Sequence, residues 1–294
     1  MSRWYITAVI FTMKKCFVIL SALVLIAFSG CKKAGAPITK DFGTVGPYTE
    51  LQVEDGFDVS VSNTATQITV TAGENIMPNV VVQMEGNKLR IYIHPKVSVT
   101  GPVEKTVILP YNPDLTTVRL SGASSFYSIH GLEGQRVDID LSGASNFSCS
   151  IDADEVDMDL SGASGFIGNI DAYDVDADLS GASDIRCEQL NAVELDLDMS
   201  GASYAFIDGQ AQVGSLKIEL DGASEIVRKV RNNRYVLACD ICEGRMSGSS
   251  SAYIHCDGSI AVNLSGGSDL HYSGDAATGG CTLSGGSIIT HDNP

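Results

Sequence analysis

Serine hydroxyls recur at one position of a short repeated phrase, and a hydroxyl beside a base can act as a nucleophile. The phrase has an apolar first residue, Gly third and Ser fifth, and it occurs nine times between residues 120 and 287. No His or Asp stands at a constant offset from these serines to activate them. We therefore expect a structural ladder of hydroxyls that hydrogen-bond from one repeat to the next. Its members are Ser124, Ser145, Ser164, Ser183, Ser203, Ser224, Ser250, Ser268 and Ser287.

Carboxylates supply a second pattern, because apolar and acidic residues alternate before successive phrases, as in Val156-Asp-Met158-Asp-Leu160. On a β-strand this alternation places every carboxylate on one face. Stacked repeats would align three acidic rows, whose oxygens suit weak Ca²⁺ binding better than zinc or copper. The alternative is a solvated acidic face that holds no ion, and no other cofactor is indicated. The candidate ligands are Asp138, Asp140, Asp157, Asp159, Asp176, Asp178, Asp196 and Asp198, and the rows also include Glu155, Asp174, Glu194 and Glu219.

Basic side chains cluster in one place, within the longest spacing between phrases, which is 26 residues. The cluster could bind an acidic glycan, a lipid headgroup or the acidic face of a second molecule, and the alternative is a solvated loop. A single Cys-x-x-Cys follows it, but zinc would need a second pair. The other cysteines fall mostly in apolar positions and indicate core residues. The residues of the basic cluster are Arg228, Lys229, Arg231 and Arg234, and the cysteine pair is Cys239 and Cys242.

The repeat itself predicts the elements that carry these residues. Successive phrases begin 18 to 26 residues apart, which is too short for a strand plus a full helix. A fixed short period is typical of a solenoid, and the strand alternation identifies a parallel β-helix. We expect an all-β fold in which residues 111–294 form right-handed coils, about 4.8 Å apart. Gly122 and its equivalents would stand where the chain turns each corner.

The segment before the repeats lacks the phrase but is rich in strand alternation. Runs at 57–61, 67–70, 80–84 and 89–93 predict short strands, the last two joined by a hairpin turn. We expect residues 47–110 to cap the open N-terminal end of the solenoid. Residues 31–46 mix Lys, Gly, Pro and Thr and predict a flexible tether.

The first thirty residues resemble an export signal. Lys14 and Lys15 precede a 12-residue apolar run, and Ser29-Gly30-Cys31 follows it. This order predicts a lipoprotein signal peptide over residues 1–30 and lipidation of Cys31. A plain secretory signal and a membrane-anchor helix are the alternatives, although 12 residues are short for a membrane span. We expect a protein anchored by lipid in the cell envelope, at the outer membrane, with its periplasmic or surface face left open.

The net charge of the chain excludes one class of binding partner. The chain of 294 residues has a formal net charge of -17, and nucleic acid is an unsuitable partner because phosphate binding requires a basic face. Removal of residues 1–30 would take away three basic and no acidic residues, so the mature charge would be -20. The open ends of a solenoid could also join two copies of the chain.

Residues 47–290, with TELQVEDGFDVSVSN near the start and the LSGAS coils after it, resemble the head GIN domain family of Bacteroidetes lipoproteins. The resemblance implies a β-helical adhesin head in the cell envelope, and it carries no catalytic residues. We therefore expect a non-catalytic binding or scaffold protein for a glycan, a surface polymer or another protein. The alternative is a polysaccharide lyase or glycoside hydrolase, since β-helices also host such enzymes.

Overall fold

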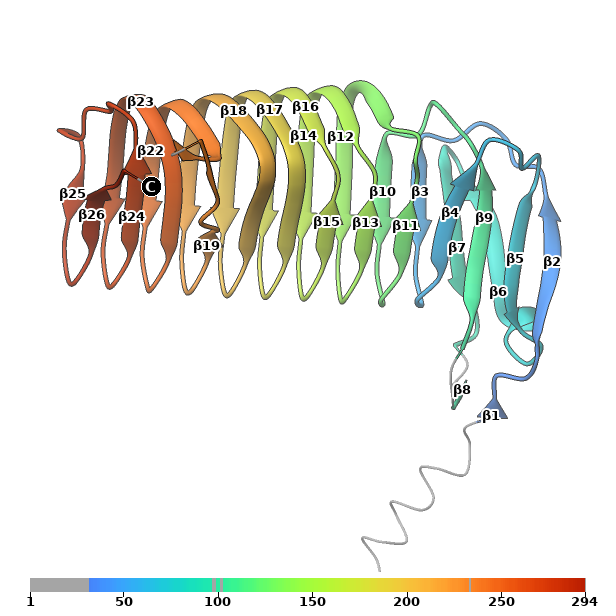
Figure 1. The fold of residues 1–294 in the computed structure, drawn as a ribbon. Helices are drawn as coiled ribbons and strands as arrows, with labels where there is room; N and C mark the ends of the chain where they lie inside the picture. The colour runs from blue at the N-terminus through green and yellow to red at the C-terminus, as the bar shows by residue number, and fades with distance from the viewer. Residues whose placement is uncertain (1–31, 97–98, 101–102, 233, 294) are drawn as a thin grey trace, which may run out of the picture.

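The computed structural model describes residues 32–96, 99–100, 103–232 and 234–293. Strands wind into a long solenoid whose coils stack side by side, with an N-terminal unit closing one end (Figure 1). The predicted parallel β-helix is confirmed. The strands of the repeats are β10 (Thr117–Leu120), β11 (Ser125–Tyr127), β12 (Leu132–Leu141), β13 (Asn146–Ser148), β14 (Ile151–Leu160), β15 (Gly165–Ile167), β16 (Ile170–Leu179), β17 (Asp184–Met199), β18 (Tyr204–Leu220), β19 (Glu225–Ile226), β22 (Leu237–Met246), β23 (Ser251–Leu264), β24 (Asp269–Ser273), β25 (Thr282–Leu283) and β26 (Ile288–His291).

Each phrase forms a corner between two successive strands of the solenoid. The third-position glycines all adopt positive φ, with Gly162 at 80°, a conformation that costs an L-residue energy. A Cβ on Gly162 would also lie 2.4 Å from the carbonyl oxygen of Gly143 in the preceding coil. The corner therefore requires glycine for both conformation and space, as the sequence predicts.

The fifth-position serines are buried in every phrase but the last, where Ser287 is half-buried, and their hydrogen bonds differ from the expected ladder. Ser164 Oγ donates to the carbonyl oxygen of Ser161 in its own phrase at 2.9 Å, and Ser145 repeats this with Ser142 at 2.8 Å. The turn brings the second carbonyl of the phrase within reach of the fifth side chain. These hydroxyls thus hydrogen-bond within their own corner, and serines at the second position of the phrase mostly make long contacts to the preceding coil, as from Ser161 to Leu141 at 3.4 Å. Ser247 differs, because its Oγ bonds Asp221 Oδ1 of the preceding coil at 2.6 Å.

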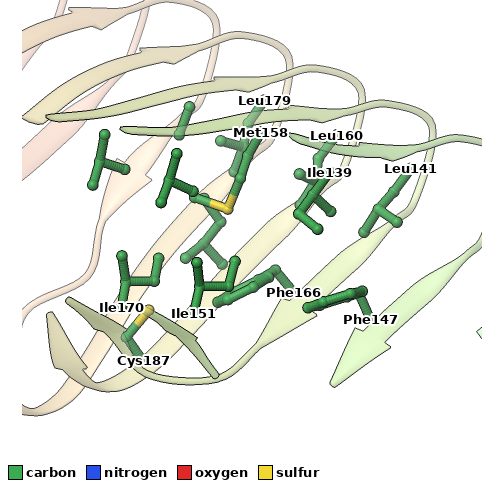
Figure 2. Packing of buried hydrophobic residues seen from close by; sticks show 14 of the residues in the cluster. Ile139, Leu141, Phe147, Ile151, Met158, Leu160, Phe166, Ile170, Leu179 and Cys187 are labelled. Atoms are coloured by element: carbon green, nitrogen blue, oxygen red, sulfur yellow. The ribbon is translucent and has the colours of Figure 1, made fainter. Parts of the chain in front are cut away.

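The core repeats with the coils, because a parallel register places the same inward position of every coil in one column (Figure 2). Phe126, Phe147 and Phe166 stack with ring centroids 5.2 and 5.6 Å apart. A second column contains the first residues of the phrases and is buried from Leu120 to Leu264, whereas Leu283 in the last coil is 51% exposed. Repetition of large apolar side chains at fixed slots fills the interior between the two strand layers.

The N-terminal unit corrects two expected boundaries. Residues 37–43, expected within a flexible tether, form β2 and pair antiparallel with β5. Residues 50–62, expected within the cap, form a first coil in register with the repeats, with Val53 beside Leu120. β2 and β6 are then the outermost strands that close this end. The elements are β1 (Lys32–Lys33), β2 (Pro37–Gly43), β3 (Glu50–Val53), β4 (Asp58–Ser62), β5 (Ile68–Gly73), a 3₁₀ turn (Met77–Asn79), β6 (Val80–Glu85), β7 (Lys88–Ile93), β8 (Val99–Thr100) and β9 (Lys105–Pro110).

The expected signal peptide and Cys31 lie outside the described residues. Within the residues that the structure describes, no helix has the length and apolar character to cross a membrane.

Candidate functional site

The acidic rows lie where the sequence places them. Asp138, Asp157, Asp176 and Asp196 are direct neighbours on successive strands, and the same register aligns the row of Asp140. The third row runs from Glu155 through Asp174 to Glu194. All the predicted ligands thus share one outer face of the long strands.

Basic residues flank these rows, which the sequence interpretation did not anticipate. In the register of the sheet, Arg119 precedes Asp140 and Arg245 follows Glu219 in one row. Arg119 bonds Asp140 at 2.8 Å, and Arg245 forms an ion pair with Glu219. In a second row Lys217 stands between Asp196, with which it forms an ion pair, and Glu243 on the next strand.

Arg136 begins the third row and pairs with Asp138 at 2.9 Å, with Glu155 and with Asp157. The face is therefore a block of carboxylates between basic residues, and not a uniformly acidic surface. Asp176, Asp178 and Asp198, in the middle of the block, have pKa values raised first by burial and then by neighbouring carboxylates.

The block does not form a closed metal cage in this structure. Among the described residues, no three His, Cys, Asp or Glu side chains converge in a way that could hold a metal ion. A shallow cavity of about 270 Å³ lies over the rows, with Asp157, Asp176, Asp196 and Lys217 in its wall. Ca²⁺ binding by these carboxylates therefore stays a hypothesis for experiment.

The four residues of the basic cluster have two different surroundings in the structure. Arg228 lies over the rings of Tyr235 and Tyr253, each 6.0 Å from the guanidinium carbon, and Lys229 forms an ion pair with Asp208. Arg231 and Arg234 stand opposite each other in a small hairpin, β20 (Val230–Arg231) and β21 (Arg234–Tyr235).

The hairpin is fastened to the solenoid by Tyr235, which is buried. Tyr235 Oη donates to Asp292 Oδ2 at 2.5 Å, and His271 Nδ1 lies 2.8 Å from the same oxygen. Tyr253 and His271 stack at 4.8 Å beneath it.

A side groove on the short-strand edge of the coils is a feature that the sequence analysis missed. It has a volume of about 580 Å³ and crosses several coils, with Tyr127, Ile129, Ile167 and Phe206 as its apolar residues. Tyr127 and Ile167 are each 53% exposed, and Ile129 is 74% exposed. These are large fractions for apolar side chains, and such patches commonly mark binding surfaces.

The side groove could have been found by aligning the repeats on the phrase. The residue three places after the phrase is Tyr127, Ser148, Ile167, Arg186 and Phe206 in successive coils, and these are register neighbours. Steps of about 4.8 Å therefore spread the five side chains over about 19 Å.

Two buried cysteines, Cys149 and Cys187, lie along the floor of the side groove. Burial raises the pKa of Cys149 to about 11 and that of Cys187 to about 12, which makes both thiols poor nucleophiles. The groove therefore offers contact surface and hydrogen-bonding groups, and its thiols are unsuited to covalent chemistry.

A second cavity, the loop pocket, lies beneath the basic hairpin and has a volume of about 570 Å³. Its wall includes Arg231, Arg234, Asp240, His255 and Asp257. Cys239 also lies there, buried and in register with Cys256, and its contact with Cys256 and burial raise the pKa of Cys239.

Ser273, His255 and Asp257 have the composition of a hydrolytic triad. His255 Nδ1 lies 3.0 Å from Ser273 Oγ, and Asp257 Oδ2 lies 3.3 Å from Nε2. However, Ser273 is buried and its hydroxyl oxygen accepts a hydrogen bond from the Tyr235 backbone N–H at 3.3 Å. A nucleophile must reach the substrate, and this hydroxyl is covered.

The architecture and the sites define a class: a parallel β-solenoid with surface grooves and a charged outer face. A family model described as "Putative auto-transporter adhesin, head GIN domain" matches residues 47–227 and 165–276. The chain belongs to this family, as its sequence resemblance predicts. The family description is that of an adhesin and names no catalysed reaction.

Solved structures with the same fold come from Parabacteroides. A putative adhesin of Parabacteroides merdae matches with a TM-score of 0.63 and 17% identity over 90% of this chain and 99% of that one. A putative adhesin of Parabacteroides distasonis matches with a TM-score of 0.59 and 18% identity, over 89% of this chain and 99% of that one. A putative lipid binding protein of Parabacteroides distasonis matches with a TM-score of 0.51 and 18% identity, over 90% of this chain and 100% of that one. No curated protein matches the chain.

Proposed function

We propose that this protein is a non-catalytic lipoprotein of the cell envelope that binds a glycan chain along the side groove. The observation that carries the proposal is a row of apolar side chains on alternate coils, in which Tyr127 and Ile167 are exposed and Phe206 is half-buried. Sugar rings present apolar faces that pack on such side chains, while their hydroxyls need hydrogen-bond partners nearby.

The groove supplies those partners between its apolar residues. Asn169, Arg186, Glu188 and Asp208 all line it. Arg186 bonds Asp184 at 2.6 Å, and Asp208 pairs with Lys229, so both are held in place. The charges of the lining are mixed, which favours a neutral glycan over a strongly anionic one.

An elongated ligand suits the geometry better than a compact one. The apolar side chains are spread over about 19 Å along the axis. A polymer could contact several of them at once, and each added contact would raise the overall affinity. Adhesion to a surface glycan uses this kind of extended contact.

The proposed location depends on Cys31. Anchoring by lipid at the outer membrane is supported by the sequence order of Lys14, the apolar run and Ser29-Gly30-Cys31. Cys31→Ala should release the protein from the membrane fraction of cells that express the full chain. Detergent partitioning that does not change would contradict this part of the proposal.

The binding proposal is tested with the mature domain on an array of neutral and acidic oligosaccharides. We expect retention of a neutral oligosaccharide, weakened about tenfold or more by Tyr127→Ala with Phe206→Ala. Tyr173→Ala is the matched control, because Tyr173 is also exposed (59%) but lies outside the groove. Equal losses in both variants, or no retained glycan, would overturn the proposal.

A further inference from the structure

The loop pocket contains a buried histidine nitrogen that lacks a hydrogen bond. His255 is 7% exposed and lines the pocket. Its Nε2 makes no hydrogen bond to any residue that the structure describes, although Asp257 Oδ2 lies 3.3 Å away outside hydrogen-bonding geometry. A buried polar atom without a partner costs free energy, so it calls for an explanation.

The hydrogen-bond network assigns the proton on this ring. Ser273 Oγ already accepts the Tyr235 backbone N–H at 3.3 Å, and its remaining described contact is His255 Nδ1 at 3.0 Å. The buried Ser273 hydroxyl is satisfied only if it donates to Nδ1. The neutral imidazole then carries its proton on Nε2. The pocket therefore presents a donor that needs an acceptor.

Two guanidinium groups supply further donors on the wall. Arg231 and Arg234 are register partners across the hairpin, and both are exposed. Arg231 Nη1 has a carbonyl partner, Gly209, at 3.3 Å, which leaves other N–H groups of this side chain available. Like charges on facing positions repel, and an oxyanion between them would relieve that repulsion.

The pocket also contains acceptors. Asp240 and Asp257 belong to its wall, beside the three donors. A simple anion would be repelled by these carboxylates, whereas a sugar acid can offer them hydroxyl protons. The mixture of donors and acceptors therefore fits a saccharide that has a carboxylate and several hydroxyls.

We propose that the loop pocket is a second binding site, selective for acidic saccharides, with His255 Nε2 and the guanidinium groups of Arg231 and Arg234 holding the carboxylate. Asp240 and Asp257 accept hydrogen bonds from the sugar hydroxyls. This site is separate from the side groove, so it stands whether or not the groove binds a neutral glycan.

The test is calorimetric titration of the mature domain with trigalacturonate, a neutral galactose trimer and inorganic phosphate. We expect trigalacturonate to bind at least about tenfold more tightly than phosphate. In the Tyr127→Ala and Phe206→Ala variant, whose side groove is impaired, it should also bind at least about tenfold more tightly than the neutral trimer. The double change Arg231→Gln with Arg234→Gln should weaken trigalacturonate binding about tenfold or more, and His255→Ala should also weaken it. Because Arg231 and Arg234 are exposed, the double variant should keep the fold even if His255→Ala does not.

Two controls separate this site from other effects. Lys88→Gln removes a positive charge in the distant N-terminal unit and should leave trigalacturonate affinity unchanged. Tyr127→Ala with Phe206→Ala should also leave it unchanged, because these residues line the side groove. Equal binding of phosphate would overturn the proposal, and so would equal binding of the neutral trimer by the Tyr127→Ala and Phe206→Ala variant, or wild-type affinity for trigalacturonate in the double arginine variant.

Discussion

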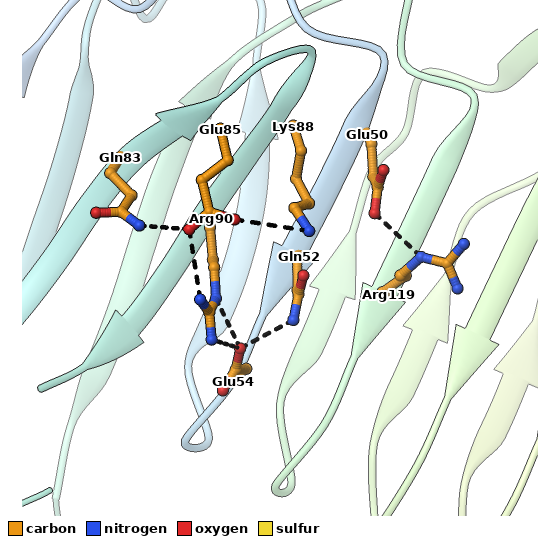
Figure 3. Close-up of polar contacts among 8 residues, drawn as sticks. All are labelled: Glu50, Gln52, Glu54, Gln83, Glu85, Lys88, Arg90 and Arg119. Carbon is orange, nitrogen blue, oxygen red and sulfur yellow. Dashed lines mark hydrogen bonds and ion pairs between the residues drawn. The ribbon is translucent and has the colours of Figure 1, made fainter.

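The same outer sheet face has opposite electrostatics in two regions of the molecule. In the N-terminal unit, opposite charges alternate across the strands: Arg90 bonds Glu54 at 2.7 Å, and Glu50 bonds Arg119 of the first repeat at 3.0 Å (Figure 3). Further along, Asp157, Asp176 and their neighbours stand in rows of like charge. The first region is neutralised within itself, and the second is neutralised only at its ends.

The difference in charge arrangement follows from the presence of sequence repeats in one region and their absence in the other. Repeated coils in parallel register place each residue beside its own copy, so an acidic position becomes an acidic row. The N-terminal strands carry different sequences, and antiparallel pairs such as β6 with β7 place Glu85 beside Lys88. Repetition thus gives a regular core and corner at the cost of repeated charges, which the irregular region avoids.

The largest expected effect concerns the corner glycines. Gly162→Ala forces both a positive φ on alanine and a contact of 2.4 Å with the Gly143 carbonyl oxygen, and should cost about 2–5 kcal/mol. Gly86→Ala, in the N-terminal hairpin, also has positive φ but has nothing within 4 Å, and should cost about 1 kcal/mol. Denaturant unfolding of both variants measures the difference; equal costs would mean that coil stacking does not tighten the corner.

The buried phrase serines should have a smaller effect. Ser164→Ala leaves the Ser161 carbonyl without its 2.9 Å hydrogen bond and should cost about 1 kcal/mol. Ser142→Ala removes a half-buried hydroxyl with only a 3.4 Å contact and should cost less than about 0.5 kcal/mol. Thermal unfolding followed by circular dichroism compares the pair, and the reverse order would show that coil-to-coil bonds dominate.

The two electrostatic regions should respond to pH with opposite signs. Folding raises the pKa of Asp176, Asp178 and Asp198, so these groups destabilise the fold above their folded pKa and cease to do so below the unfolded pKa. The Gln83 side chain, through its hydrogen bond, is the main cause of the lowered pKa of Glu85, with Arg90 and Lys88 adding to it. The ionised Glu85 carboxylate therefore stabilises the fold at pH values above its pKa in the unfolded chain. This contribution is lost as the pH falls through the lower pKa that Glu85 has in the folded protein.

Changing the three aspartates to asparagine should therefore raise the melting temperature at pH 7 by about 1–3 °C. The gain should shrink towards pH 4, where the wild-type carboxylates accept protons. Glu85→Gln should lower the melting temperature at pH 7 and have less effect at pH 4. Melting curves at both pH values check this, and a triple variant that is less stable than wild type at pH 7 would contradict it.

The smallest expected effect is that of Ca²⁺ on the like-charged rows. Millimolar CaCl₂ should raise the melting temperature slightly more than NaCl at the same ionic strength, because a bound divalent ion stabilises the folded rows by linkage. Asn at Asp157, Asp159, Asp176 and Asp178 should remove that excess. Equal responses to the two salts would identify the rows as a solvated surface.

The sequence predicts the solenoid and its acidic rows because a fixed period transfers each position to the next coil. The repeat pattern did not reveal the first corner, at residues 53–57, because Val-Glu-Asp-Gly-Phe forms this corner without matching the phrase. There Asp55 takes positive φ, and Phe57 fills the place of the buried serine. Pairing of β2 was also missed, since an exposed edge strand shows little apolar alternation.

The sites were harder to predict than the fold. The side groove depends on outward residues that vary from coil to coil, so no repeated motif marks it. The loop pocket needs a hairpin inserted between two coils to lie over His255, and such packing leaves no local sequence signal. Spacing identified Arg231 and Arg234 as candidates, but only the fold separates them from Arg228 and Lys229.

Binding without catalysis would distinguish this protein from β-helical enzymes that cleave polysaccharides, and the fate of a bound glycan decides between the two. The mature domain is incubated with a neutral oligosaccharide retained on the array, and the glycan is then recovered and weighed by mass spectrometry. We expect the glycan to be retained by wild type, released by the Tyr127→Ala and Phe206→Ala variant, and unchanged in mass. Shortened or unsaturated products formed by wild type would contradict this expectation.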